Sequence, residues 1–131
     1  QKAQRQFGLI PSKPVQRNEK KLSIPFHNEK LIKVKIPAKL PKLLVAYPAP
    51  SLITATNKRD VYALMLLSFL LTGNESSRLN KQYIRDEKIA LAVDSDYELY
   101  RRFSDLFIFE ITPSPQSNLL QLEKALNQSV I

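Results

Sequence analysis

The sequence predicts an α+β fold in which helices pack on one face of a largely antiparallel sheet. Two stretches of strand-like composition come first, and a long apolar helical stretch and a second helical stretch follow them. Two more strand-like stretches come next, and the last segment has apolar residues at helical spacing. The predicted order is therefore β-β-α-α-β-β-α, and this grouping of strands and helices is typical of α+β domains.

The first two strands are predicted between residues 31 and 47. Ile32, Val34 and Ile36 alternate with lysines, which is the pattern of a half-buried strand near a sheet edge. The continuous apolar run 43–47 follows a proline-containing connection and predicts the second strand. Because the two segments are close in sequence, we expect them to form an antiparallel pair.

The middle of the chain predicts two helices. Asp60 is a suitable N-cap for a helix over 60–71, whose apolar residues cover most of its circumference. We expect such a helix to be buried between a sheet and another helix. Gly73 suits a left-handed turn at the end of this helix, and a second helix is expected from about Ser76 to Asp86.

Strands are predicted again after the second helix. Ile89, Leu91 and Val93 alternate with small or polar residues, which favours a strand with these three side chains on one face. The run 103–111 is the most strand-like part of the chain. The leucine spacing over 119–130 predicts a final helix, so these elements complete the sheet and its helical layer.

Composition and charge divide the chain into a connector and a compact unit. The 131 residues are 44% hydrophobic and fit one domain with a real core. The net charge is +8, but residues 1–45 carry 11 Lys/Arg against two Asp/Glu, whereas residues 46–131 carry 9 against 10. Seven of the nine prolines fall in residues 1–50, so helix is not expected there. We interpret residues 1–28 as a connector and 29–131 as the compact unit.

The basic charge allows one alternative, a module that binds polyanions such as nucleic acid or anionic lipid. We expect neither nucleic-acid binding nor membrane insertion, because the compact unit is close to neutral. In addition, no segment reaches the roughly 20 apolar residues that a membrane-spanning helix needs.

The residue types leave little with which to build an active site. A zinc site needs three or four His, Cys or carboxylate ligands, but His27 is the only histidine and there is no cysteine. A Ser-His-Asp triad would also depend on His27, and Ser76 and Ser77 lack the flanking glycines of a nucleophile elbow. Two glycines cannot form a glycine-rich phosphate loop. We expect no catalytic residue, metal site or cofactor in this chain.

Residues 60–79 resemble a recurrent segment of the pitrilysin family of zinc metallopeptidases. The family pattern is an acidic residue, Ala-Leu, an apolar helix, a glycine-containing turn and Ser-Ser-Arg-Leu. The corresponding residues here are Asp60, Ala63, Leu64, Gly73, Ser76, Ser77, Arg78 and Leu79. Residues 85–93 resemble the family's basic-acidic run into a strand, and residues 7–11 with the following basic segment resemble the link between its two homologous halves. The resemblance therefore covers nearly the whole chain.

The resemblance implies that residues 29–131 are part of the second, C-terminal half-domain, which binds no zinc. In the family, zinc is held in the first half by an inverted His-x-x-Glu-His motif and a distant Glu, and this motif is absent here. The implied partners are that zinc-binding half, in the same chain or a paralogous subunit, and a peptide substrate. The parent protein would hydrolyse peptide bonds, while this half closes the chamber and helps hold an extended peptide. A complete half-domain is longer, so we expect the final elements to be missing.

Some second halves of the family also supply an Arg and a Tyr that contact substrate near the zinc. The Tyr position falls here on Leu91, and the Arg position falls on Ile84 or, with a shift of one residue, on Arg85. Arg85 is therefore the one candidate for substrate contact in this chain. The departure from the pattern leaves open a second alternative, a catalytically inactive structural subunit of the same family.

The other motif residues are expected to be structural, and they are Asp60, Gly73, Ser76, Ser77, Arg78 and Leu79. The family suggests the bacterial periplasm or cell envelope as a location. The substrate and the oligomeric state have no signature in this sequence.

Overall fold

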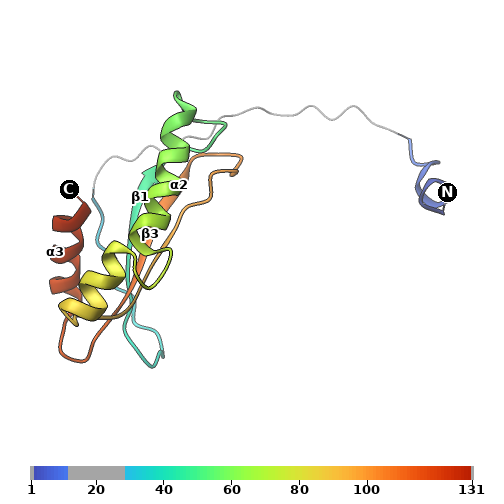
Figure 1. Cartoon of the computed structure of the whole chain (residues 1–131). Coiled ribbons are helices and arrows are strands. Elements are labelled where there is room, and N and C mark those ends of the chain that lie inside the picture. Colours follow the sequence, from blue (N-terminus) through green and yellow to red (C-terminus); the bar gives the residue numbers. More distant parts are fainter. Residues whose placement is uncertain (1, 12–28, 131) are drawn as a thin grey trace.

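The computed structural model describes residues 2–11 and 29–130 (Figure 1). Its elements in chain order are α1 (Lys2–Phe7), β1 (Leu43–Ala49), α2 (Lys58–Thr72), the π-helix η1 (Asn80–Asp86), β2 (Ala90–Asp96), β3 (Asp105–Pro113) and α3 (Leu119–Val130). The mixture of helices with one antiparallel sheet confirms the predicted α+β class. Most of the predicted connector, residues 12–28, is not among the described residues.

The sheet has three strands in the order β1-β3-β2, and both pairings are antiparallel. The most strand-like segment of the sequence thus forms the central strand, with Val45 of β1 opposite Phe109 and Val93 of β2 opposite Ile111. Side chains alternate along β1, so Val45 packs on the core while Leu44 is 64% exposed. Among the described residues β1 and β2 are the two edges of the sheet.

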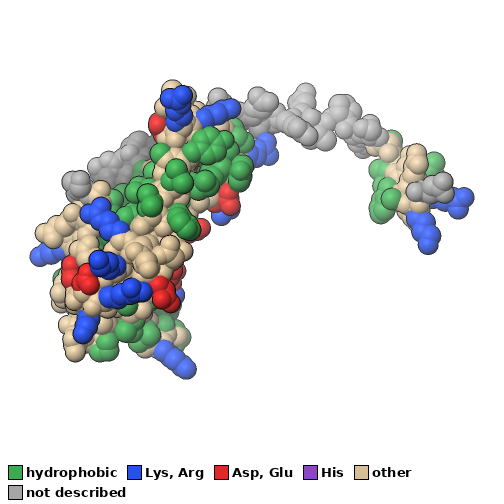
Figure 2. All heavy atoms as spheres, viewed as in Figure 1, with side chains coloured by type: hydrophobic (Ala, Val, Ile, Leu, Met, Phe, Trp, Pro, Cys, Tyr) green, Lys and Arg blue, Asp and Glu red, His purple; other side chains and the backbone are tan. Residues whose placement is uncertain are grey.

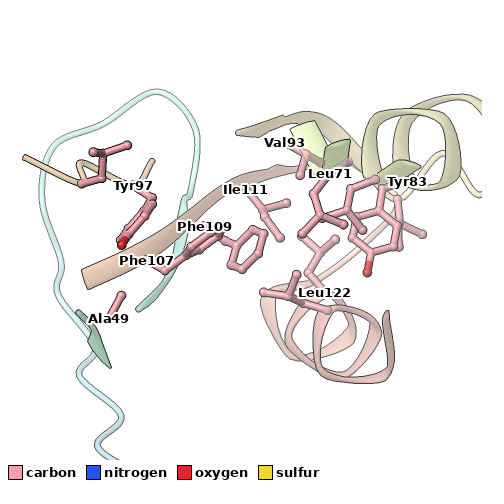
Figure 3. Close-up of a cluster of buried hydrophobic side chains, with 14 of the residues drawn as sticks. Ala49, Leu71, Tyr83, Val93, Tyr97, Phe107, Phe109, Ile111 and Leu122 are labelled. Atoms are coloured by element: carbon pink, nitrogen blue, oxygen red, sulfur yellow. The ribbon is translucent and has the colours of Figure 1, made fainter. Parts of the chain in front are cut away.

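The core lies between one face of the sheet and the helices. Figure 3 shows Leu71 of α2, Tyr83 of η1 and Leu122 of α3 converging on Ile111 of the central strand. The core continues along β3 as an aromatic row, in which the rings of Phe107 and Phe109 are 5.1 Å apart between centroids. Because α2, η1 and α3 all contribute buried side chains to this face, the predicted packing of helices on one face is correct.

The predicted strand over residues 31–36 is wrong. Residues 29–42 form no helix or strand, and the side chains of Ile32, Val34 and Ile36 are 65%, 72% and 70% exposed. Alternation shows which side chains a strand could bury, but it does not provide a neighbouring backbone to pair with. The connection to β1 also contains Pro37 and Pro41, which have no N–H to donate to a ladder.

Helix α1 contradicts the expectation that the proline-containing segment has no helix. Residues Lys2–Phe7 are helical, and the helix ends before Pro11, the first proline of the chain. Proline prevents helix only locally, so its frequency over 50 residues says nothing of the first ten.

Both ends of α2 differ from the prediction. Asn57 is the N-cap, because its Oδ1 accepts from the N–H of Arg59 at 3.1 Å, while Asp60 lies inside the first turn. Gly73 has a right-handed backbone (φ −64°), so the predicted left-handed turn is wrong. A Cβ at Gly73 would lie 2.5 Å from Cδ2 of Phe69, and this close approach is what favours glycine there.

Only one side of α2 is covered, which contradicts the prediction that the helix is buried between a sheet and another helix. Val61 and Leu71 are buried against the sheet. The opposite side is apolar and open, and Figure 2 shows hydrophobic side chains gathered along this helix. This α2 outer face consists of Tyr62, Met65, Leu66, Phe69 and Leu70, which are between 42% and 65% exposed. Helix α3 packs mainly on β1 and β3.

Candidate functional site

The turn between α2 and η1 is held together by the side chain of Asn80. Its Nδ2 donates to the carbonyl oxygens of Thr72 and Asn74, at 3.1 and 2.9 Å, and to Oγ of Ser77 at 3.1 Å. Ser77 is buried and its Oγ donates to the Asn74 carbonyl, while the N–H of Ser76 donates to Oδ1 of Asn74. Both serines are therefore part of the turn, and the carbonyl of Ser77 accepts the first helical hydrogen bond, from the N–H of Lys81 at 2.9 Å. Sequence reasoning missed Asn80 because an amide inside a predicted helix carries no distinctive signal.

Helix η1 is wider than the expected α-helix. The N–H of Glu87 donates to the carbonyl of Gln82 at 2.9 Å, which spans five residues rather than four. The N–H of Ile89 then donates to the carbonyl of Tyr83. The turn closed by this hydrogen bond contains Lys88, whose φ is 55°. The left-handed backbone predicted for Gly73 at the end of α2 is thus found instead at Lys88, after the end of η1. Single π-helical turns occur frequently at functional sites.

Two completely buried side chains anchor η1. Leu79 and Tyr83 are both 0% exposed, and Oη of Tyr83 donates to Oγ of Ser129 on α3 at 2.8 Å. Burial raises the pKa of Tyr83, and the hydrogen bond to Ser129 opposes that increase. Arg78, the remaining motif residue, is exposed. These contacts hold η1 against both the sheet and α3.

Two adjoining depressions lie between η1 and β2. The first is about 370 Å³ and is lined by Glu75, Asn80, Ile84, Arg85 and residues 91–94. The second is about 320 Å³ and is lined by Ile84, Lys88, residues 90–91 and residues 114–116. Ile84 and Leu91 line both depressions. Together the two form what we call the β2-edge groove.

The groove runs along the free edge of β2. Four consecutive strand residues, 91–94, line the first depression. Successive side chains of a strand point to opposite faces, so only the edge of the strand presents all four to one space. In the described part of the chain β2 pairs with β3 alone, and its other edge therefore carries N–H and C=O groups that no strand pairs with.

A bulge determines how Leu91 enters the groove. The pairing with β3 shifts between Ala90 and Ala92, so one extra residue is inserted into β2. Leu91 is consequently 50% exposed, whereas Ile89 and Val93 are buried. The prediction that these three residues share one face is wrong, because a strict period of two assumes an unbroken ladder.

Arg85, the sequence's candidate for substrate contact, does lie in the groove. Its side chain is 53% exposed, and Nη2 is 3.5 Å from Oε2 of Glu75, whose side chain is 95% exposed. Ion pairs as exposed as this one contribute little, so the guanidinium can leave Glu75 at small cost. The other sheet edge, β1, contains Pro48, which has no N–H for a further strand. The β2 edge contains no proline.

Metal ligands do not gather in the described part of the chain. Over residues 2–11 and 29–130, no three His, Cys, Asp or Glu side chains are placed to hold a metal ion. His27 falls outside those ranges. No helix in the described ranges combines the length and apolarity needed to cross a bilayer.

Over the described residues, the fold and the groove define an α+β domain in which the β2 edge of the sheet lines a groove. A family profile described as "Peptidase M16 inactive domain" matches residues 1–131, and the chain belongs to this family. This is the inactive domain of the peptidase family that the sequence resembles, so the resemblance is confirmed.

The solved structures similar to this chain include one titled "The crystal structure of a protease from Helicobacter pylori". The TM-score is 0.61 and the identity 23%, over 72% of this chain and 21% of that one. At this identity the likeness shows the fold alone. The chain spans about a fifth of the length of that protease. No curated protein matches the chain.

Proposed function

We propose that this chain is the non-catalytic second half of a zinc metalloendopeptidase, closes its chamber and helps hold an extended peptide. Its membership of the inactive-domain family supports the first part of the proposal. The observation that carries the peptide-holding role is the groove along the unpaired edge of β2. An extended peptide can add to such an edge as a further strand, with side-chain depressions giving specificity.

The proposal assigns the chemical step to the zinc-binding half, in the same chain or in a paralogous subunit. Zinc bound there would polarise a water molecule that attacks the peptide carbonyl. The described residues of this chain do not fit a zinc ion, because no ligand set gathers among them. Their contribution is positional: the β2 edge aligns the peptide backbone, and Ile84 and Leu91 contact its side chains. Holding the peptide in place lowers the entropic part of the barrier.

Peptide titration of the ¹⁵N-labelled chain tests the holding role. A five-residue peptide of alternating valine and threonine should shift the amide signals of residues 90–94 and of η1. Arg85→Ala should weaken binding about two- to five-fold, as expected for an exposed polar contact. The matched control is Arg59→Ala, an exposed arginine at the start of α2, which should bind as the wild type does. Shifts confined to other elements would contradict the proposal.

Hydrolysis tests the division of labour. The purified chain with added zinc should leave the same peptide intact, and chelator-sensitive cleavage by this chain alone would contradict the proposal. The alternative, an inactive structural subunit, is favoured by Leu91 at the family's Tyr position, and by Ile84 at its Arg position if the alignment is not shifted by one residue to Arg85. If the chain holds substrate, adding it to the zinc-binding half should raise kcat/KM for an extended peptide. A purely structural subunit would restore stability without the dependence on Arg85.

A further inference from the structure

We infer that the β2-edge groove takes a short peptide antiparallel to β2, with its carboxyl end beside Lys88 and its amino end beside Asp94. The inference rests on the proposed function and adds to it a direction and a preference for charged ends. Two observations carry it: the direction in which β2 crosses the two depressions, and the different charge of each depression.

The two depressions lie in a fixed order along β2. The strand begins at Ala90, which lines the second depression, and reaches Asp94, which lines the first. Leu91 belongs to both. The groove is therefore as long as the strand segment 90–94, which is about 16 Å at 3.3 Å per residue. A peptide of about five residues fills this length.

The charges differ between the two ends of the groove. The first depression carries two carboxylates, Glu75 and Asp94, against one guanidinium, Arg85. Because Arg85 lies 3.5 Å from Glu75, Asp94 is left as the net negative charge of that end. In the second depression Lys88 is the one charged side chain of the lining. The groove is thus negative at the Asp94 end of β2 and positive near Lys88, where β2 begins.

This charge distribution selects one direction of binding. In an antiparallel pair the carboxyl end of the peptide lies beside the start of β2, and its amino end lies beside residue 94. A free carboxylate then meets Lys88, and a free α-amino group or a basic residue meets Asp94. Parallel addition would place like charges together at both ends. Antiparallel pairing is also the commoner type in proteins, so the charges and the general preference favour the same arrangement.

The middle of the groove sets the side-chain preference. Ile84 is half-buried and Leu91 is turned outward by the bulge, and the two line both depressions. An apolar side chain in the central part of the peptide would cover them and remove apolar surface from water. The ligand is therefore a short peptide with an apolar centre, a basic or free amino end, and a free or acidic carboxyl end.

Paramagnetic labelling of the full chain tests the direction. The probe is Lys-Thr-Val-Thr-Val with a nitroxide-labelled cysteine in place of its second or fourth residue. The label near the carboxyl end should broaden the amides of Ala90 and Leu91 more than those of residues 94–96. The label near the amino end should do the opposite.

Blocking the ends tests the charge preference. Amidating the carboxyl end should weaken binding about two- to five-fold in the wild type, as for a solvent-exposed ion pair. In Lys88→Gln the free and amidated probes should bind equally. Lys81→Gln, an exposed lysine of η1 outside the groove lining, is the matched control and should keep the wild-type difference.

The outcomes separate this inference from the proposed function. Reversed broadening would overturn the direction while leaving a peptide held at β2. An amidation effect that persists in Lys88→Gln would overturn the assignment of the carboxyl end. If no probe, free or blocked, perturbs β2 or η1, both the inference and the peptide-holding role are overturned.

Discussion

Replacing Tyr83 by phenylalanine removes one hydroxyl where η1 meets α3. Oη donates to Oγ of Ser129 at 2.8 Å, and the tyrosine is 0% exposed. Ser129 is only partly buried, so its hydroxyl can turn to water once its partner is gone. The loss is therefore that of one ordinary hydrogen bond. We expect the free energy of unfolding at pH 8 to fall by about 0.5–1.5 kcal/mol.

Alkaline pH provides a second measurement on the same variant. Burial raises the pKa of Tyr83, and the nearby Glu87 adds to the increase. An acid whose pKa is higher in the folded state stabilises the fold fully below its unfolded pKa, near 10 for tyrosine. That contribution is lost as the pH rises through the folded pKa. The stability of the wild type should therefore fall above about pH 10, and it should fall less in Tyr83→Phe.

Urea unfolding followed by far-UV circular dichroism at pH 8 and pH 11 measures both effects. Some alkaline loss should persist in the variant, because burial also raises the pKa of Tyr47 and of Tyr97. The control is Tyr100→Phe, whose side chain is 76% exposed and which should change stability by less than about 0.5 kcal/mol. The reasoning is refuted if Tyr83→Phe matches this control at pH 8, or if its alkaline loss equals that of the wild type.

Three further predictions concern the core, the backbone and metal. Leu79→Ala should lower the free energy of unfolding, measured in urea, by about 2–5 kcal/mol because it empties a fully buried site. Leu44→Ala, on the open face of the sheet, should lower it far less, and equal losses would contradict this prediction. Lys88→Gly should raise the free energy of unfolding by about 0.5–1 kcal/mol, since glycine adopts a positive φ without strain; a lower melting temperature would be inconsistent with that strain. Calorimetric titration with zinc should show no stoichiometric binding, and a tight one-to-one complex would refute the assignment of metal to the other half.

Periodicity predicted most of the fold. The segments 43–47, 60–71, 105–111 and 119–130 have the predicted type, because the length of each apolar run and the spacing of its residues distinguish strand from helix. The wrong predictions arise where the sequence pattern does not show which other segment lies beside the element. Residues 31–36 alternate as a strand does, yet no strand of the described chain pairs with them. Helix α2 is apolar over most of its circumference, and its sequence does not indicate which side another element covers.

The groove was only partly predictable. Family resemblance pointed to Arg85, which the structure places in the β2-edge groove. The bulge that turns Leu91 outward, the π-helical bonding of η1 and the left-handed Lys88 carry no composition signal, because each depends on hydrogen bonds between segments. The pattern of side-chain polarity does not indicate a one-residue shift in backbone hydrogen bonding.

The wide turn of η1 also bears on how this domain can tolerate insertions and deletions. Its hydrogen bonds span one residue more than those of an α-helix. Deleting a single residue between Leu79 and Glu87 would permit ordinary helical bonding with the flanking segments kept in place. Ile84 and Arg85 would then be rotated around the helix axis relative to β2. A change of a single codon would thus alter the lining of the β2-edge groove on an unchanged scaffold.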